Sequence, residues 1–309
     1  MNIIQGHIES MPSDCVLTIG KFEGIHLGHG ALIKEVVYKA KCEGLLSAII
    51  VFEPHPYSVL GNDEYSPLFT NEERLHLLED TGLDYLIVQP FDVDFSKTSP
   101  LDFCNKIFND FKAKVVIVGK DYRFGKDRMG NVELLSKQAK IFDAKIIMMP
   151  LIANETLGLP VSTSQIRNLV STQNLEEAEK MLGFPFFIKG KTAAGKQVGR
   201  TIGFPTLNIY PVNKFLPNNG VYVTLTFIDN IPYPSITNVG LSPTVQPNNN
   251  VKCVESHLLK TPISENYGID IKTEFLKFIR AEQRYSTKND LKEQITKDIN
   301  VALKWHGIN

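Results

Sequence analysis

The fold of the first half of this chain is decided by Val16-Leu-Thr-Ile-Gly20-Lys-Phe-Glu-Gly24-Ile-His26-Leu-Gly28-His29. Its apolar run predicts a buried strand, its glycine-rich segment a turn, and the stretch that follows it a helix. Glycines let the backbone approach an anion, and the N–H groups at the start of a helix attract one. The segment therefore predicts a phosphate site with two histidines, His26 and His29, at its edge. A turn that carries two surface histidines is the alternative.

Apolar runs alternate with helix-period stretches up to about residue 184. The runs are 16–19, 48–52, 85–88, 115–118 and 145–149, and the stretches are 31–42, 71–81, 100–111 and 131–139. In the second stretch, Leu75 and Leu78 form an apolar face, and Arg74 and Glu79 form a charged one. Apolar strands joined by helices predict a doubly wound α/β fold with a parallel sheet. Ligands of such sheets bind beyond the carboxyl ends of the strands, where Gly20–His29 falls.

The remainder of the chain has strand-like segments that no helix separates. They are 221–228, 235–239, 252–259 and 271–279, with turns expected at 229–232 and 246–250. This order predicts an antiparallel barrel or sandwich. A C-terminal helix is expected from Lys288 to Leu303, with Thr287 and Asp290 as its capping pair. We place the boundary near residue 184, which gives domains 1–184 and 185–309.

Composition limits the classes of function. A chain of 309 residues favours two domains, and a net charge of −1 gives no support to a nucleic-acid-binding or membrane surface. The first residues show no signal peptide, and no apolar run is long enough to span a bilayer. We expect a soluble cytoplasmic protein that acts on small molecules, with no nucleic acid, membrane or obligatory protein partner.

The cysteines are scattered, without the spacing of a disulfide framework or of a zinc site. They are Cys15, Cys42, Cys104 and Cys253. We expect all four to be buried or half-buried thiols in a reducing compartment.

A second glycine-rich segment runs from Gly195 to Asn208. On a strand, Thr206 and Asn208 point to the same side. Neutral oxygens on one face help to position Mg²⁺, which prefers oxygen ligands, and the glycines permit close approach to phosphates. A strand entry bounded by glycine and proline, with no ligand, is the alternative.

Glu255 follows in a strand-like segment, with His257 on the same face. A carboxylate at this place could orient or deprotonate a hydroxyl that attacks a γ-phosphate. An exposed strand glutamate without a chemical role is the alternative.

The first motif also matches a known pattern. Its form, Gly-x-Phe-(Asp/Glu)-Gly-x-His-x-Gly-His, resembles the His-x-Gly-His signature of adenylyltransferases. The segments Val51–Pro56, Val118–Gly125 and Val161–Arg167 resemble the N-terminal module of bacterial bifunctional riboflavin kinase/FAD synthetases, which adenylylates FMN. Glu23 stands where that family usually has Asp, and Gln165 where it often has Arg.

This resemblance implies roles for single residues. His26 and His29 would stabilise the α-phosphate of ATP while the FMN phosphate attacks it. His55 and Arg123 would line the flavin or nucleotide pocket; the alternatives are a packed histidine in a rigid turn and a surface ion pair. The ATP- or phosphate-binding residues of this module would be Gly20, Phe22, Gly24 and Gly28 in the loop, and Ser162, Thr163, Ser164 and Arg167 on the side of the departing pyrophosphate.

The second module resembles riboflavin kinase. Its segment Gly-Arg-x-x-Gly-Phe-Pro-Thr-x-Asn is similar to that family's signature, and Glu255 aligns with its catalytic base. The resemblance implies a riboflavin kinase-like barrel in which Thr206 and Asn208 position Mg²⁺–ATP. Its phosphate-binding residues would be Gly199, Arg200, Gly203, Pro205 and Thr206. Ser242 stands before Pro243 where the family usually has Arg or Lys.

Both modules, in the family's order, imply two reactions: riboflavin and ATP give FMN, and FMN and ATP then give FAD and pyrophosphate. Two other interpretations are a riboflavin kinase with an inactive or regulatory first module, and a flavin-responsive regulator, which an added nucleic-acid-binding segment would favour. A cytidylyltransferase would share His26 and His29 but would leave the second motif and Glu255 unexplained.

Overall fold

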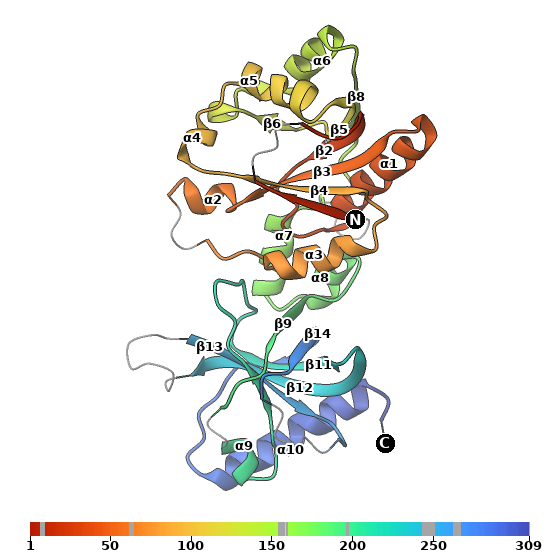
Figure 1. The fold of residues 1–309 in the computed structure, drawn as a ribbon. Helices are drawn as coiled ribbons and strands as arrows, with labels where there is room; N and C mark the ends of the chain where they lie inside the picture. The colour runs from red at the N-terminus through yellow and green to blue at the C-terminus, as the bar shows by residue number, and fades with distance from the viewer. Residues whose placement is uncertain are drawn as a thin grey trace. The chain divides into compact units, whose positions relative to one another are not determined.

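The computed structural model describes residues 1–6, 10–61, 65–153, 158, 160–195, 198–242, 251–261 and 267–308. Contacts between residues divide the chain into two compact units, Met1–Thr163 and Ser164–Asn309. Figure 1 shows an α/β unit and a β-rich unit that ends in a long helix. The domain boundary that we expect at residue 184 stays a prediction.

The first unit alternates strands and helices. Its strands are β1 (Asn2–Gln5), β2 (Cys15–Ile19), β3 (Leu46–Glu53), β4 (Tyr85–Pro90), β5 (Ala113–Gly119), β6 (Arg123–Phe124), β7 (Gly130–Asn131) and β8 (Lys145–Met149). Its helices are α1 (Leu27–Glu43), α2 (Pro56–Val59), α3 (Asn71–Glu79), α4 (Val93–Ser96), α5 (Pro100–Asn105) and α6 (Val132–Ile141), with a π-helical turn at Lys106–Asp110 and a 3₁₀ turn at Lys126–Arg128. Helix α7 (Thr163–Ser171) begins at the division between the units.

Six of these strands form one parallel sheet in the order β1-β4-β3-β2-β5-β8. From β2 the chain proceeds to β3 and β4 on one side, and then crosses to β5 and β8 on the other. The direction therefore reverses between β2 and β5. A crevice forms at such a reversal, beyond the carboxyl ends of the strands. Gly20 follows β2 at this point, so the fold agrees with the expected position of the glycine loop.

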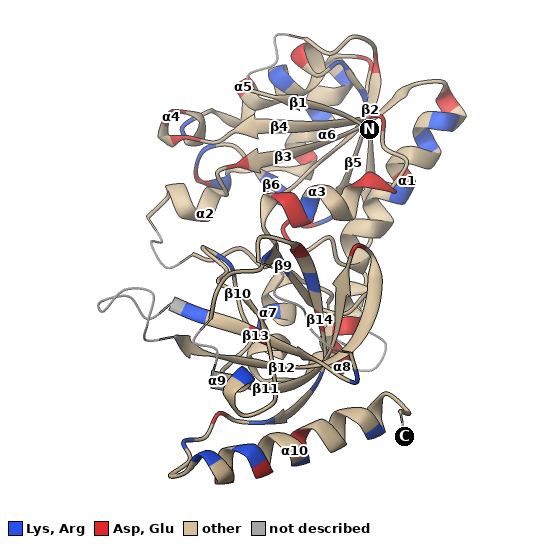
Figure 2. Ribbon diagram, turned by 60° about the horizontal axis from the view of Figure 1, so that its bottom comes forward, with Lys and Arg blue, Asp and Glu red and all other residues tan. Residues whose placement is uncertain are grey.

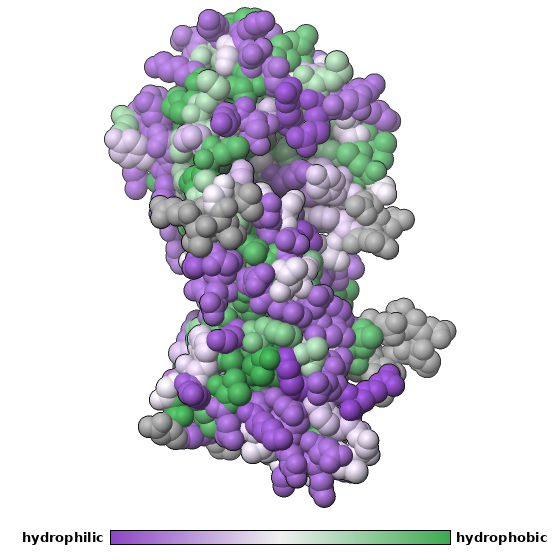
Figure 3. Space-filling view, turned by 180° about the vertical axis from the view of Figure 1, so that it is seen from behind, coloured by the Kyte–Doolittle hydropathy of each residue, from purple (hydrophilic) through white to green (hydrophobic). Residues whose placement is uncertain are grey.

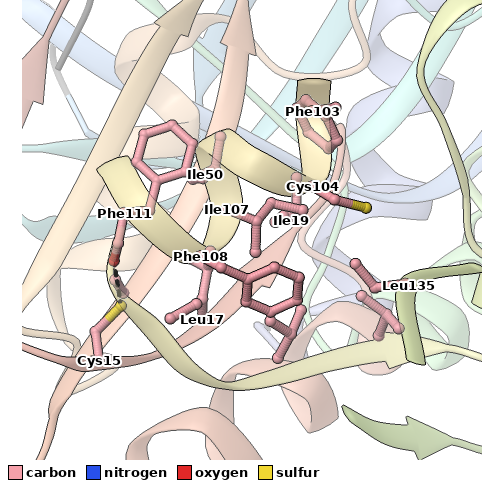
Figure 4. Close-up of a cluster of buried hydrophobic side chains, with 14 of the residues drawn as sticks. Cys15, Leu17, Ile19, Ile50, Phe103, Cys104, Ile107, Phe108, Phe111 and Leu135 are labelled. Carbon is pink, nitrogen blue, oxygen red and sulfur yellow. Dashed lines mark hydrogen bonds between the residues drawn. The ribbon is translucent and has the colours of Figure 1, made fainter. Parts of the chain in front are cut away.

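The central strands β2, β3, β4 and β5 are buried on both faces because most of their side chains are apolar. Leu17 and Ile50 face the side covered by α5, the π-helical turn and α6, where Figure 4 shows them packed among phenylalanines. On that side the Cys15 thiol donates a hydrogen bond to the carbonyl of Phe111. Val16 and Ile49 face the other side, with residues of α1 and α3. The doubly wound α/β fold is confirmed.

Two expectations for the first unit were wrong in detail. Arg74, expected on the charged face of α3, is only 6% exposed, because its Nη2 donates to Asn71 Oδ1 and lies 3.9 Å from Glu53 Oε2. Cys42 is exposed on α1, whereas the other three cysteines are buried; all four are free thiols.

The second unit contains helices α7, α8 (Leu175–Leu182), α9 (Val198–Thr201) and α10 (Lys288–Trp305). Its strands are β9 (Phe187–Lys191), β10 (Leu207–Ile209), β11 (Gly220–Ile228), β12 (Ile231–Ser242), β13 (Val251–Leu258) and β14 (Asp270–Arg280). They form an antiparallel sheet in the order β10-β13-β12-β11-β14-β9. An isolated bridge between Ala193 and Asn208 brings the two ends of the sheet together, so the barrel is nearly closed.

Six hydroxyl side chains meet inside the barrel, and all are fully buried. They belong to Thr224 and Thr226 on β11, Ser235 and Thr237 on β12, Ser256 on β13 and Thr273 on β14. Each is hydrogen-bonded to the next in a closed cycle with O–O distances from 2.7 to 3.4 Å. We call this cycle the hydroxyl ring. Because every member has two partners within the ring, polar side chains can occupy the interior of the barrel.

Helix α10 covers the outer face of β11 and β12. Its Ala302, Ile299 and Leu303 pack on Val221 and Val223 of β11. The expected capping pair is confirmed, since Thr287 and Asp290 bond each other's backbone N–H groups. The turn expected at 229–232 is confirmed at Asp229 and Asn230, both in the left-handed region. The turn expected at 246–250 and the Pro243-Thr244 pair lie outside the described residues.

Candidate active sites

The two histidines of the first loop lie against each other at the start of α1. Their rings stack with centroids 3.8 Å apart and planes 16° apart. His26 is the N-cap of α1, and its Nδ1 accepts a hydrogen bond from the backbone N–H of His29 at 3.3 Å. A side chain at Gly28 would lie 3.1 Å from His26 Cε1, so the glycine leaves room for the imidazole. The loop thus brings the predicted pair together.

The protonation of this pair follows from its surroundings. Burial lowers the pKa of His26 to about 4 and lowers the pKa of His29 well below its usual value, so both are neutral at pH 7. His26 Nδ1 is an acceptor, which puts the proton on Nε2. His29 Nδ1 is buried without a hydrogen-bond partner among the described residues, and an unpaired lone pair costs less than an unpaired N–H. Both rings therefore offer an Nε2–H donor.

The loop before the histidines has an unusual backbone. Phe22 and Ile25 have φ values of 43° and 40°, a region that side chains other than glycine seldom adopt. Both side chains are buried in the core, and the Phe22 ring packs on His29 at 4.8 Å. Burial of two apolar side chains therefore holds the strained turn in place. Phe22 is one of the predicted phosphate-binding residues. Because its side chain is buried, only its backbone is available to a ligand.

Glu23 connects this loop to other parts of the first unit. It is 7% exposed, its Oε1 accepts a hydrogen bond from the Leu68 N–H at 2.7 Å, and its Oε2 lies 3.9 Å from His55 Nε2. The His55 ring stacks on Tyr65 with centroids 4.4 Å apart. The carboxylate therefore reaches partners on two segments, although it is one methylene longer than the aspartate usual at this position.

An aromatic and basic surface lies beside His55. Lys21 Nζ lies 3.6 Å from the centroid of the Tyr57 ring, which is half exposed. Lys21 lowers the pKa of Tyr57 through a side-chain hydrogen bond, and the charge of Arg128 acts in the same direction. Sequence reasoning missed Lys21, Tyr57 and Tyr65. Tyr57 and Tyr65 follow His55 within ten residues, but Lys21 is distant in the sequence, so no local pattern joins the three.

The segment Ser162–Arg167 crosses the division between the two units. In the first unit, Thr163 Oγ1 lies beside the glycine loop, 3.6 Å from the place where a Gly24 side chain would begin. In the second unit, Ser164 is exposed, and the Arg167 guanidinium lies 4.9 Å over the Phe215 ring. Arg123 is exposed on β6. The pyrophosphate role of Ser162–Arg167 and the pocket role of Arg123 stay predictions.

The glycine segment of the second unit forms a tight turn that leads into β10. The Phe204 N–H donates to the Gly199 carbonyl at 2.7 Å, and any side chain at Gly199 would clash with the Phe204 carbonyl. Gly203 has a φ of 97°, which favours glycine. The turn exposes Arg200 and leaves Thr206 half-buried directly before β10.

Three polar residues lie side by side across β10, β13 and β12. Glu255 is opposite Asn208 on one neighbouring strand and opposite Asn238 on the other. Residues directly opposite in an antiparallel pair have side chains on the same face. The predicted base is therefore flanked by the predicted metal-binding amide and by a second amide, Asn238, which sequence reasoning missed. Its short strand pattern, Thr237-Asn-Val-Gly240, gave no chemical signal.

Thr206 and Asn208 suit a magnesium ion only with help from a substrate. Asn208 is 7% exposed, and its Oδ1 lies 4.0 Å from the Cys253 thiol. The two residues supply neutral oxygens, and no group of three His, Cys, Asp or Glu side chains suited to a metal occurs among the described residues. Magnesium binds through few protein oxygens when nucleotide phosphates supply the others. The donor set fits a Mg²⁺ that arrives with ATP.

Charge is mixed over both units. Figure 2 shows Lys and Arg interspersed with Asp and Glu, as along α10. On the face in Figure 3, hydrophilic residues surround smaller apolar areas. In the part of the chain that the structure describes, no helix has the length and hydropathy of a membrane span.

Comparison with known families gives a match for each unit. The FAD synthetase family model matches residues 8–164, and the riboflavin kinase family model matches residues 182–306. Together they account for most of the chain, in the order that the two motifs predict.

Curated relatives match over nearly the full length of the chain. The bifunctional riboflavin kinase/FMN adenylyltransferase of Escherichia coli strain K12 is 32% identical, with 100% of this chain and 99% of the relative covered. The protein of the same name from Bacillus subtilis is 31% identical over 96% and 94% of the two chains. A crystal structure described as a macrolide-efflux protein from Streptococcus pneumoniae has a TM-score of 0.87 and 27% identity, covering 98% of this chain and 99% of that one.

Proposed function

The chain belongs to the bifunctional riboflavin kinase/FMN adenylyltransferase family, and from this premise we propose which residues carry each of its two reactions. The enzyme phosphorylates riboflavin with ATP to give FMN, and it adenylylates FMN with ATP to give FAD and pyrophosphate. The observation behind the division is that each unit contains its own glycine turn beside groups suited to phosphate chemistry. We assign adenylyl transfer to the first unit and the kinase reaction to the second.

In adenylyl transfer, an oxygen of the FMN phosphate attacks the α-phosphorus of ATP, and the bond to the pyrophosphate oxygen breaks. His26 and His29 donate their Nε2–H groups to the α-phosphate oxygens, where negative charge builds up. Neutral imidazoles suit this role because they bind phosphate without needing a proton from solvent. The displacement is direct, since no side chain in this loop has the arrangement of a covalent nucleophile.

The departing pyrophosphate and the flavin have separate sets of residues in this proposal. Thr163, beside Gly24, holds the pyrophosphate together with Ser162. The flavin side comprises His55 and Arg123. Support comes from the proximity of Thr163 Oγ1 to the loop and from the link between His55 and Glu23.

In the kinase reaction, the riboflavin 5′-hydroxyl attacks the γ-phosphorus of ATP, and ADP departs. Glu255 accepts the hydroxyl proton. Thr206 and Asn208 would hold the Mg²⁺ that accompanies ATP, with Gly199, Arg200, Gly203 and Pro205 around the phosphates. When bound, Mg²⁺ neutralises part of the phosphate charge. The cross-strand pairing of Glu255 with Asn208 supports this assignment because it sets the proposed base beside a residue proposed to hold Mg²⁺.

The other interpretation, a kinase whose first module is inactive or regulatory, predicts a different product. It rested on the Glu23 departure or on another change in the first module, and in the structure the Glu23 carboxylate accepts a 2.7 Å hydrogen bond from the Leu68 N–H. The histidine pair and its glycines are also in place. We therefore propose that both modules are active, in a cytoplasmic enzyme whose partners are riboflavin, FMN and ATP.

The test uses full-length variants that separate the two reactions. His29→Ala should reduce FAD formation from FMN by roughly 10²-fold and leave FMN formation from riboflavin intact. Glu255→Gln should have the reverse effect. His76→Ala and Glu293→Gln are controls, since both side chains are exposed and lie away from the two motifs. Equal loss of both activities in either test variant would refute the assignment.

A further inference from the structure

We propose that His257 is a positioning residue for the kinase reaction: it holds the Pro205 carbonyl and thereby sets the place of Thr206. The inference rests on the proposed function, in which Thr206 binds Mg²⁺–ATP. His257 lies on the same face of β13 as Glu255, yet no step of the mechanism above uses it. Its contacts with Phe204 and Pro205 lie within the second unit.

The central contact is a short hydrogen bond. His257 Nδ1 lies 2.7 Å from the Pro205 carbonyl oxygen. A carbonyl oxygen only accepts, so Nδ1 carries the proton and donates. The Phe204 ring also meets the imidazole edge-on, with centroids 5.7 Å apart and planes 87° apart. The imidazole therefore touches the turn at two successive residues.

The segment that His257 contacts has fixed backbone on both sides. Before it, the Phe204 N–H is bonded to the Gly199 carbonyl. After it, Leu207 begins β10 and lies opposite Ser256. Pro205 and Thr206 lie between these anchors, and Pro205 has no N–H with which to join a ladder. A hydrogen bond to the Pro205 carbonyl is thus well placed to fix the remaining two residues.

Strand register puts His257 beside Thr206. Leu207 pairs with Ser256 and Asn208 with Glu255. Continuing this antiparallel register by one position sets Thr206 opposite His257, at a point where β10 has not yet begun. The same strand, β13, therefore carries both the predicted base and the group that holds the nucleotide segment. A shift of β13 would move both together, which preserves their spacing.

The imidazole can donate this hydrogen bond in either protonation state. Burial lowers the pKa of His257, and the bond to Pro205 opposes that shift. Both the neutral Nδ1–H form and the protonated form can donate from Nδ1. The proposed role therefore requires an N–H donor at the Nδ1 position of His257 and does not require a charged ring.

Three substitutions in the full chain separate a donor role from a role in packing. The amide of His257→Asn places a donor near the position of Nδ1, whereas His257→Gln extends it by one methylene. His257→Ala removes it. We expect the Ala and Gln variants to raise the KM for Mg²⁺–ATP in FMN formation about five- to tenfold, the effect of one hydrogen bond. The Asn variant should have a KM for Mg²⁺–ATP within about twofold of the wild-type value.

A matched control lies in the same unit. His306 Nε2 also bonds a backbone carbonyl, that of Thr224, at 3.1 Å. His306→Ala should leave the KM for Mg²⁺–ATP unchanged. FAD formation from supplied FMN monitors the first unit, and Trp305 fluorescence monitors folding of the second. If the Ala variant does not fold, the comparison of Asn with Gln decides.

The outcomes distinguish this inference from the proposed function. An Asn variant as impaired as the Gln variant, or a Gln variant with the ATP dependence of wild type, would overturn the role of His257. Thr206→Ala in the same assay tests the premise alone. If Thr206→Ala leaves the KM for Mg²⁺–ATP unchanged, the assignment of Thr206 fails whatever the His257 variants do.

Discussion

Replacing Thr237 by valine tests whether the hydroxyl ring stabilises the barrel. Valine has nearly the shape of threonine and a similar preference for strands, so the change removes little except the hydroxyl. Thr237 Oγ1 lies 2.7 Å from Thr224 Oγ1 and 2.8 Å from Ser256 Oγ. A methyl group in its place would also sit too close to both oxygens.

The expected magnitude follows from these two contacts. Each lost hydrogen bond costs about 1 kcal/mol, and one neighbour keeps a buried O–H without an acceptor, which costs about 1–3 kcal/mol. Thr224 retains Ser235, and Ser256 retains Thr273, which limits the loss. We expect Thr237→Val to lower the free energy of unfolding of the second unit by roughly 2–4 kcal/mol.

The assay is urea unfolding of the full chain, followed by fluorescence. The chain has one tryptophan, Trp305, and it lies in α10, so the signal reports on the second unit. Thr237→Ser keeps the hydroxyl and loses a buried methyl, which should cost about 1 kcal/mol. Thr296→Val, on the exposed side of α10, should change stability by less than about 0.5 kcal/mol. A valine variant at position 237 that is as stable as the serine variant would refute the reasoning.

Three further predictions concern the histidine loop and α10. Gly28→Ala adds a methyl 3.1 Å from His26 Cε1, so FAD formation should fall while FMN formation is unchanged, as chromatography of the products would show. Burial lowers the pKa of His26 to about 4 from an ordinary value of about 6.5. The folded protein therefore has its full stability above pH 6.5 and loses the contribution of neutral His26 as the pH falls toward 4. The loss from pH 7 to pH 5 is on the order of 2 kcal/mol, and circular dichroism during urea unfolding should show it reduced in His26→Gln. Asp298 is 3% exposed and accepts hydrogen bonds from Arg280 at 2.7–3.1 Å, so Asp298→Ala should cost about 3–5 kcal/mol in the Trp305 unfolding assay. If the stability of His26→Gln fell with pH as much as that of wild type, the role of His26 would be contradicted. If Asp298→Ala hardly changed the free energy of unfolding, the role of the Arg280–Asp298 pair would be contradicted.

Much of the α/β unit was predictable because its strands are continuous apolar runs. The runs at 16–19 and 115–118 became β2 and β5, each with a residue or more added. β1 was missed because Asn2–Gln5 is short and lies at the sheet edge, where one face stays exposed. Helix α7 was missed although Ile166, Leu169 and Val170 have helical spacing, because the segment Val161–Arg167 was interpreted as a phosphate-binding loop. Helix α8 was missed as well.

The barrel interior could not be predicted from alternation alone. On β11, Thr224 and Thr226 alternate with Val223 and Leu225, a pattern that normally places the hydroxyls in solvent. In the structure the hydroxyls are inside, and α10 covers the apolar side. Alternation identifies two faces, but which of them faces inward depends on partners that come from other strands and on a helix that lies much later in the chain.

The glycine spacing singled out His26 and His29, and the structure brings the two rings together. Glu255 was singled out by its strand position and by the family resemblance, and the roles of all three residues stay predictions. The loop conformation was not predictable, since the positive φ values of Phe22 and Ile25 depend on burial of their own side chains. Asn238 and the contact of His257 with Pro205 depend on strand register, which no local pattern in the sequence reveals.

Two reactions at two separate sites are the central claim, and mixing two inactive variants tests it most directly. His29→Ala and Glu255→Gln proteins are each incubated with riboflavin, ATP and Mg²⁺, alone and together, and FMN and FAD are separated over time. His29→Ala alone should accumulate FMN, Glu255→Gln alone should give neither product, and the mixture should form FAD. The mixture could also form no FAD although Glu255→Gln still converts supplied FMN to FAD and His29→Ala still makes FMN. That result would mean that the two reactions do not share free FMN. Loss of both activities in each variant would contradict the two-site account itself.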